Sequence, residues 1–251
     1  MTERALRRGK SGNLDRVKIW MNWTRSRYPL SENLRMSQFL LPPGYGRALR
    51  HVVLACVFFL SSAVFAHFFS KRDAISRVSI GTAYGALFLA GLALMLGPWN
   101  LLRGRSNPVS FNLRRDVGIW AGVAAVVHTA VGLNVHLRGR PWLYFVNEHH
   151  HMRTGMFGFG NDIGLVSALL FLMLLVISND FSLRRLGAVK WKSLQRWTYV
   201  AIVLTVVHAI AYQNVEKRTL PFRVLVYAVC AAILVLQIAG VLRRTSETRI
   251  P

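Results

Sequence analysis

The sequence predicts an all-α fold, a polytopic membrane protein built as a six-helix transmembrane bundle. Of the 251 residues, 53% are hydrophobic, and the mean hydropathy of +0.34 is higher than soluble domains show. The apolar residues also cluster into runs of roughly 20, the length that a helix needs to cross the hydrocarbon core of a bilayer. Strands are excluded because polar and apolar residues do not alternate, and only closed barrels of strands can span a membrane.

The six apolar runs occupy about residues 48–69, 80–97, 117–136, 162–178, 196–214 and 221–242. Together they indicate one membrane domain over residues 48–242, with a short tail over 243–251. A basic tail over residues 1–47 comes first. Within it, Leu14, Val17 and Met21 share one helical face, which is typical of an interfacial helix on anionic lipid. A basic, partly disordered tail is equally compatible with these residues.

Helix breakers and charges predict where the runs end. Gly97 and Pro98 are expected to end the second run, and the glycines from Gly155 onward are expected to keep the segment before the fourth run pliant. The residues around Arg184 are expected to form a short basic loop before the fifth run. His51, at the start of the first run, is expected to be a solvated histidine at headgroup level.

The net charge of +22 would suggest a nucleic-acid partner in a soluble chain, but here the charges lie between apolar runs. With the N-terminus inside, 23 Lys and Arg residues fall on the inner side and 9 on the outer side. This asymmetry predicts that both termini are cytoplasmic. Cys56 and Cys230 lie inside predicted spans without CxxC spacing, so neither a zinc site nor a disulfide framework is expected.

Two histidines near the middle of apolar runs are the candidate site. A lone histidine deep in a membrane helix is costly without a partner and indicates function. His128 lies about 11 residues into the third run and His208 about 12 into the fifth, so both sit roughly 17–18 Å deep. At one depth on two helices, they can take the opposite axial positions of one heme iron, which suits electron transfer. The alternative is that each is a histidine hydrogen-bonded to another helix.

The loop after the third run is rich in potential metal ligands. It contains His149, His150 and His151 in succession, followed by Met152. Clustered His and Met side chains can bind copper, iron or zinc, which makes this loop a possible outer metal site. Consecutive loop residues rarely close around a metal, so a solvated loop is the alternative. Arg138 and Arg140, just before it, are expected near outward-facing heme propionates.

One motif carries a resemblance to a known family. SNDFSLRRLG at residues 178–187, followed by Trp191, Leu194, Arg196 and Tyr199 and then a helix with a central histidine, is similar to the ferric reductase-like transmembrane domain family. The helices RRDVGIWAGVAAVVHTAVGL and GFGNDIGLVSALLFLMLLVIS resemble its third and fourth spans, so the resemblance covers about residues 80–240. The closest similarity is to short, flavin-free members, which include the heme subunit of the bacterial periplasmic methionine-sulfoxide reductase system.

The resemblance implies a b-type heme between the third and fifth spans, with its ligands at His128 and His208, and electron transfer across the bacterial inner membrane. One position departs from the family pattern: Gln195 stands where a histidine usually begins the fifth span. Because Gln is a poor heme ligand, one heme is expected rather than two. No G-x-G-x-x-G or P-loop motif is found. A quinol or a separate flavoprotein is therefore expected to donate electrons, and a periplasmic or membrane protein to accept them.

Two other functions remain open at this point. Gln195 favours a structural or assembly subunit of a membrane complex that keeps the fold without redox activity. The histidines of the outer loop favour a metalloreductase that holds Fe(III) or Cu(II) at the outer face.

Overall fold

The structure, a computed structural model, describes residues 45–69, 71–104, 109–137 and 140–247. All regular elements in these ranges are helices, apart from one isolated bridge between Val146 and Met152. Residues 1–44, which hold the predicted interfacial helix, lie outside the described ranges. Residues 49–251 form one compact unit, separate from residues 1–48. The predicted all-α class is therefore confirmed for the described part of the chain.

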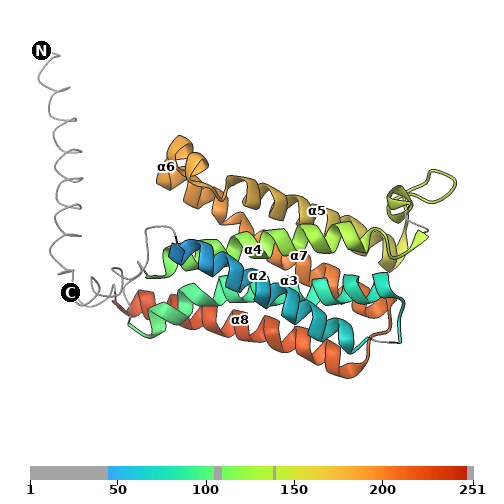
Figure 1. The fold of residues 1–251 in the computed structure, drawn as a ribbon, viewed down its shortest axis with the longest axis horizontal. Coiled ribbons are helices and arrows are strands. Elements are labelled where there is room, and N and C mark those ends of the chain that lie inside the picture. Colours follow the sequence, from blue (N-terminus) through green and yellow to red (C-terminus); the bar gives the residue numbers. More distant parts are fainter. Residues whose placement is uncertain (1–44, 70, 105–108, 138–139, 248–251) are drawn as a thin grey trace, which may run out of the picture. The chain divides into compact units, whose positions relative to one another are not determined.

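The helices follow one another along the chain, and the longest connection lies between α4 and α5 (Figure 1). They are α2 (Tyr45–His67), α3 (Ala74–Leu102), α4 (Val109–Gly132), the short 3-10 helix η4 (Pro141–Tyr144), α5 (Gly155–Ile177), α6 (Asp180–Gln195), α7 (Trp197–Val215) and α8 (Leu220–Glu247).

Within the described residues, five segments are long and apolar enough to cross a membrane, which is one fewer than predicted. They are Gly46–His67, Ala74–Leu102, Gly155–Ile177, Asp180–Val215 and Leu220–Arg243. The third predicted run falls on α4, which is not among them. Arg115, Asp116 and His128 all lie on α4 and lower its hydropathy. The chain is thus a multi-pass helical protein by length and composition, and the count of six spans is not confirmed.

Three of the predicted helix ends are wrong. Pro98 lies inside α3, which continues to Leu102. The glycine-rich segment before the fourth run is already helical, because α5 begins at Gly155. The basic segment around Arg184 is helical and belongs to α6, which is interrupted at Gly187, where the backbone is not helical. Asn179 caps its start by accepting a hydrogen bond from the backbone N–H of Ser182.

Proline is tolerated inside α3 because a side chain from α8 replaces the lost backbone hydrogen bond. Pro98 has no N–H, so it cannot bond the carbonyl of Leu94 one turn earlier. The side-chain amide of Gln237 on α8 donates to that carbonyl at 3.0 Å. In an apolar surrounding an unsatisfied carbonyl is costly, so Gln237 joins α8 to α3 at this point.

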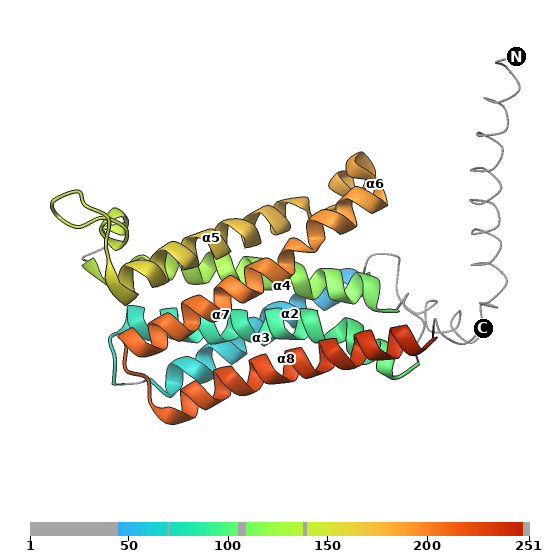
Figure 2. The same cartoon turned by 180° about the vertical axis from the view of Figure 1, so that it is seen from behind.

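Five helices make the main packing contacts of the bundle. α3 packs against α4 and α8, α5 packs against α7, and α4 packs against α5, which joins the two groups (Figure 2). Ala124 of α4 and Ala201 of α7 are fully buried, together with Leu89 of α3. Small residues at these positions let membrane helices approach closely.

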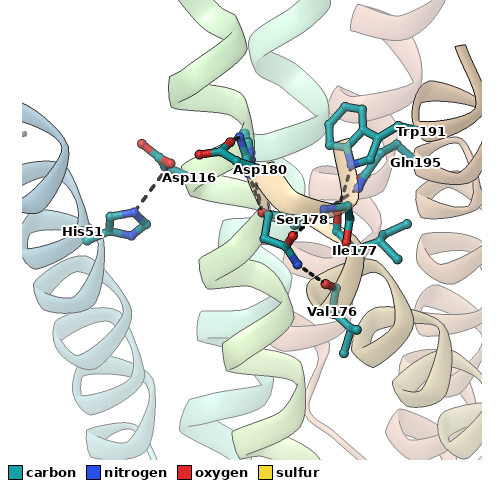
Figure 3. Close-up of polar contacts among 11 residues, drawn as sticks. His51, Asp116, Val176, Ile177, Ser178, Asp180, Trp191 and Gln195 are labelled. Atoms are coloured by element: carbon teal, nitrogen blue, oxygen red, sulfur yellow. Dashed lines mark hydrogen bonds and ion pairs between the residues drawn. The ribbon is translucent and has the colours of Figure 1, made fainter. Parts of the chain in front are cut away.

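The motif that resembles the ferric reductase-like family builds the corner between α4, α5 and α6 (Figure 3). The Arg115 guanidinium donates to the Ser178 carbonyl at 3.0 and 3.1 Å and pairs with Asp180 at 2.6 Å. The Trp191 indole donates to the Ile177 carbonyl at 2.8 Å. Because these bonds satisfy the carbonyls at the end of α5, the motif has a structural role at this end of the bundle.

His51 lies at the same end and is partly exposed, but both ring nitrogens face protein groups, which the prediction of a solvated histidine did not include (Figure 3). Its Nδ1 accepts a hydrogen bond from the Trp120 indole at 3.1 Å, and its Nε2 lies 3.6 Å from the carboxylate of Asp116. An indole N–H can only donate, so the ring proton of His51 sits on Nε2 and faces Asp116. Asp116 is fully buried and also accepts from Arg50 at 3.0 Å, which ties α2 to α4.

Replacing Gln237 with leucine should destabilise the bundle. Gln237→Leu keeps the side-chain size but leaves the Leu94 carbonyl without its donor, at an expected cost of about 1–2 kcal/mol. Thermal unfolding in detergent checks this, with Tyr227→Phe as the control, because Tyr227 is an exposed residue on the same helix. An unchanged midpoint for Gln237→Leu would show that Pro98 needs no partner from α8.

Candidate functional site

The structure brings His128 of α4 and His208 of α7 together inside the bundle. Their ring centroids are 6.4 Å apart and the ring planes are inclined by 67°. The two residues are 80 positions apart in the sequence, and their predicted equal depth is what allows them to meet. Their role as ligands is a separate question, which depends on which ring nitrogens are free.

Both imidazoles are oriented by a backbone carbonyl of a neighbouring helix. The Nδ1 of His128 lies 3.1 Å from the carbonyl oxygen of Ser79 on α3, and the Nδ1 of His208 lies 2.7 Å from that of Gly160 on α5. A carbonyl oxygen only accepts, so each Nδ1 carries the proton. Each Nε2 therefore keeps its lone pair, the state in which neutral histidine binds a metal.

A cavity of about 230 Å³ contains the two rings. Its walls come from α3, α4, α5 and α7 and include several small residues: Ala83, Ala86, Ala125, Gly164, Ala168 and Ala209. Gly164 is required by the position of His208, because a Cβ atom there would lie 2.5 Å from Nδ1 of that ring. The small side chains leave apolar space beside the two imidazoles.

The spacing of the rings fits two ligands on opposite sides of one metal ion. A metal–imidazole bond is about 2 Å long and each ring adds about 1 Å to its centroid, so opposite ligands have centroids about 6 Å apart. The observed 6.4 Å agrees with this value. The described residues contain no group of three or more His, Cys, Asp or Glu side chains that could hold a metal ion.

A hydrogen-bonded network lines the cavity toward the end away from α6. The Tyr212 hydroxyl donates to the side chain of Asn161, whose amide donates to the Tyr144 carbonyl at 2.9 Å. The Tyr144 hydroxyl donates to the Gly132 carbonyl at 2.8 Å, and burial raises the pKa of this phenol. The ring of Tyr212 lies 4.8 Å from that of His208, so the network holds α4, α5 and α7 in register around the imidazoles.

Sequence reasoning missed the partners that orient the two histidines. Ser79, Gly160 and Gly164 act through a carbonyl or the absence of a side chain, neither of which gives a residue-type signal. Asn161 and Asp162 in the run GFGND were a usable signal, because polar residues opening an apolar helix need partners.

The histidines of the outer loop are not gathered into a site. His149, His150 and His151 are exposed, and the backbone N–H groups of His149 and His151 donate to the Asn147 side chain at 2.9 and 3.0 Å. Met152 is also exposed. The predicted metal site on this loop therefore stays a prediction.

Two other predicted positions have different surroundings from those expected. Gln195 donates to the Ser178 hydroxyl at 3.2 Å, at the end of the bundle that carries α6. Arg140 pairs loosely with Glu148 at 3.8 Å on the surface and does not line the cavity, so its expected contact with propionates is not supported. Arg138 lies outside the described residues.

The glycine beside His208 gives a test of the cavity. Gly164→Ala should displace the His208 ring, because the added Cβ would overlap its Nδ1, and should weaken heme binding at least tenfold. Gly118→Ala on α4 is the matched control, since a Cβ there meets nothing within 4 Å. Hemin titration of the apoprotein, followed by absorbance, measures both variants. Equal affinities would show that His208 is not held against Gly164.

Comparison with known proteins gives distant relatives. No family model matches the chain. It is 28% identical over 178 residues to the protein-methionine-sulfoxide reductase heme-binding subunit MsrQ of Yersinia pseudotuberculosis serotype O:1b (strain IP 31758), covering 66% of this chain and 75% of the relative. The MsrQ proteins of Yersinia pestis strain Pestoides F and bv. Antiqua strain Angola are also 28% identical, with 74% of each covered. This distant homology supports the family of heme-binding subunits, whereas the ferric reductase-like domain remains a prediction.

Proposed function

We propose that this chain is a heme b-binding integral membrane protein that passes electrons across the membrane, with one heme held between His128 and His208. The observation that carries the proposal is the pair of imidazoles 6.4 Å apart, each with Nδ1 bonded to a carbonyl of a neighbouring helix. Both rings thus present a free Nε2 inside a cavity lined by small residues. The names of the relatives, which call them heme-binding subunits, support the same cofactor.

When bound, heme supplies a one-electron couple, and the residues around it decide how that couple is used. His128 and His208 would hold the heme between them, and ligation by two imidazoles would favour electron transfer over oxygen binding. The carbonyls of Ser79 and Gly160 fix each ring and make its Nε2 more basic. Stronger donation from Nε2 stabilises the oxidised iron, so these two carbonyls help to set the reduction potential.

The relatives also suggest where the electrons go. They are named subunits of a protein-methionine-sulfoxide reductase, so we propose that the acceptor is a partner oxidoreductase at the outer face. The excess of Lys and Arg in the segments assigned to the inner side supports cytoplasmic termini. The donor is then a membrane quinol or a flavoprotein on the inner side.

Axial ligation is tested by removing each imidazole. The purified protein should show the low-spin spectrum of a bis-histidine heme, and His128→Ala or His208→Ala should each abolish or severely weaken heme binding. His67→Ala is the control, because His67 is an exposed histidine at the end of α2. Wild-type spectra in both single variants would refute the assignment. A folded wild-type protein that takes up no heme would instead favour a structural or assembly subunit.

Heme stoichiometry is a second test. Gln195 is bonded to Ser178, and Arg115 beside it is engaged by Ser178 and Asp180, so this end of the bundle offers no pair of imidazoles around Gln195. A pyridine hemochrome assay should therefore give one heme per chain. Gln195→His alone should leave that value at one. Two hemes in the wild type would mean that a second ligand pair exists elsewhere in the chain.

A further inference from the structure

The cavity that contains His128 and His208 extends to a charged cluster at the end of the bundle away from α6. Four of its lining residues, Arg72, His136, Glu216 and Arg218, form what we call the mouth cluster. Arg72 pairs with Glu216 at 2.7 Å, and Nε2 of His136 lies 3.3 Å from the other carboxylate oxygen. The cluster joins the connection between α2 and α3, the segment after α4, and the turn between α7 and α8.

The mouth cluster has an excess of positive charge in a partly buried place. Burial alone would raise the pKa of Glu216. The pKa is nevertheless below its usual value, because Arg72 donates a hydrogen bond to the carboxylate and the charges of Arg72, Arg218 and His136 stabilise it. Glu216 is therefore one carboxylate beside two guanidinium groups, those of Arg72 and Arg218. Its ion pair is with Arg72. Burial lowers the pKa of Arg218, whose guanidinium lies 4.9 Å over the ring of Phe69 and has no carboxylate ion pair among those described.

The cluster lies at a distance that a planar cofactor with a charged edge can bridge. Glu216 follows His208 by eight residues, which is about 12 Å along a helix. His136 likewise follows His128 by eight residues. The cavity is continuous between the imidazoles and the cluster, with small residues beside the rings and cations at its mouth. A flat apolar body with acidic arms on one edge matches this distribution.

We propose that Arg72 and Arg218 bind the two propionates of the heme, and that Glu216 and His136 position Arg72. This inference rests on the proposed function. Guanidinium and carboxylate form charge-assisted, often bidentate, hydrogen bonds, which are among the strongest polar contacts in proteins. Glu216 competes with the propionates for Arg72, so it weakens heme binding while it keeps the arginine in place when no propionate is there.

The alternative is that the mouth cluster is purely structural and only holds the connecting segments together. In that case the affinity for heme would not depend on the charge of the propionates. The propionates can be neutralised without changing the porphyrin core by using heme dimethyl ester. The experiment therefore measures the affinity of the apoprotein for heme and for its dimethyl ester, in wild type and in Arg72→Gln/Arg218→Gln. Arg140→Gln is the matched control, since Arg140 is an arginine at the same end that does not line the cavity.

Wild type and Arg140→Gln should bind heme at least about tenfold more tightly than the ester, and the double variant should bind the two ligands about equally. Glu216→Gln should bind heme more tightly than wild type and leave the affinity for the ester unchanged. The midpoint potential of the heme should fall in the double variant, because nearby cations favour the reduced iron. Equal preference for heme over the ester in wild type and double variant would overturn the proposal.

Two further outcomes keep the test decisive. If the double variant does not fold, Arg72→Lys and Arg218→Lys retain the charge without the bidentate geometry, and each should lose part of the preference for heme; full retention would overturn the proposal. If folded wild type binds neither heme nor its ester, the proposed function itself fails. That outcome differs from one in which both ligands bind with equal affinity, which refutes only the role of the mouth cluster.

Discussion

The arrangement of the bundle depends on two hydrogen bonds between imidazole rings and backbone carbonyls. A histidine ring placed among apolar helices loses its hydration, and each ring must recover a partner from a neighbouring helix. His128 finds one on α3 and His208 finds one on α5. The carbonyls are already used within their helices, yet each has a second lone pair available. These two contacts link α4 to α3 and α7 to α5, and they leave each Nε2 with its lone pair.

The same requirement explains the polar residues that lie away from the cavity. Gln237 satisfies the carbonyl freed by Pro98, and Trp191 and Arg115 satisfy carbonyls at the end of α5. The motif at residues 178–199 therefore stabilises a corner rather than contacting the candidate cofactor site.

Sequence reasoning found the two histidines because depth in a span can be counted along the chain. It ended the second run at Pro98 because proline breaks isolated helices, and the compensating partner, Gln237, lies far away in the sequence. Arg184 was assigned to a loop because charge was taken to mean solvent exposure, although a charged helix can lie at the end of a bundle. The mouth cluster was missed for a related reason: Arg72, His136 and Glu216 belong to three separate connections, and only the fold brings them together.

The two ends of the bundle differ in a way that bears on the direction of electron flow. At the end with α6, Asp116 and Asp180 pair with Arg50 and Arg115, and these pairs do not line the cavity. At the other end, the charged residues of the mouth cluster line the cavity itself. A heme whose propionates face the mouth cluster would have a single orientation in the cavity. Its propionate edge would lie near the surface at that end, and most of the bundle would separate this edge from the α6 end. An acceptor can then approach the exposed edge directly. A quinol dissolved in the membrane could reach the heme from the side of the bundle. Its path to the heme would be shorter than that of a soluble flavoprotein at the α6 end, which is why the proposed function favours a quinol as the donor.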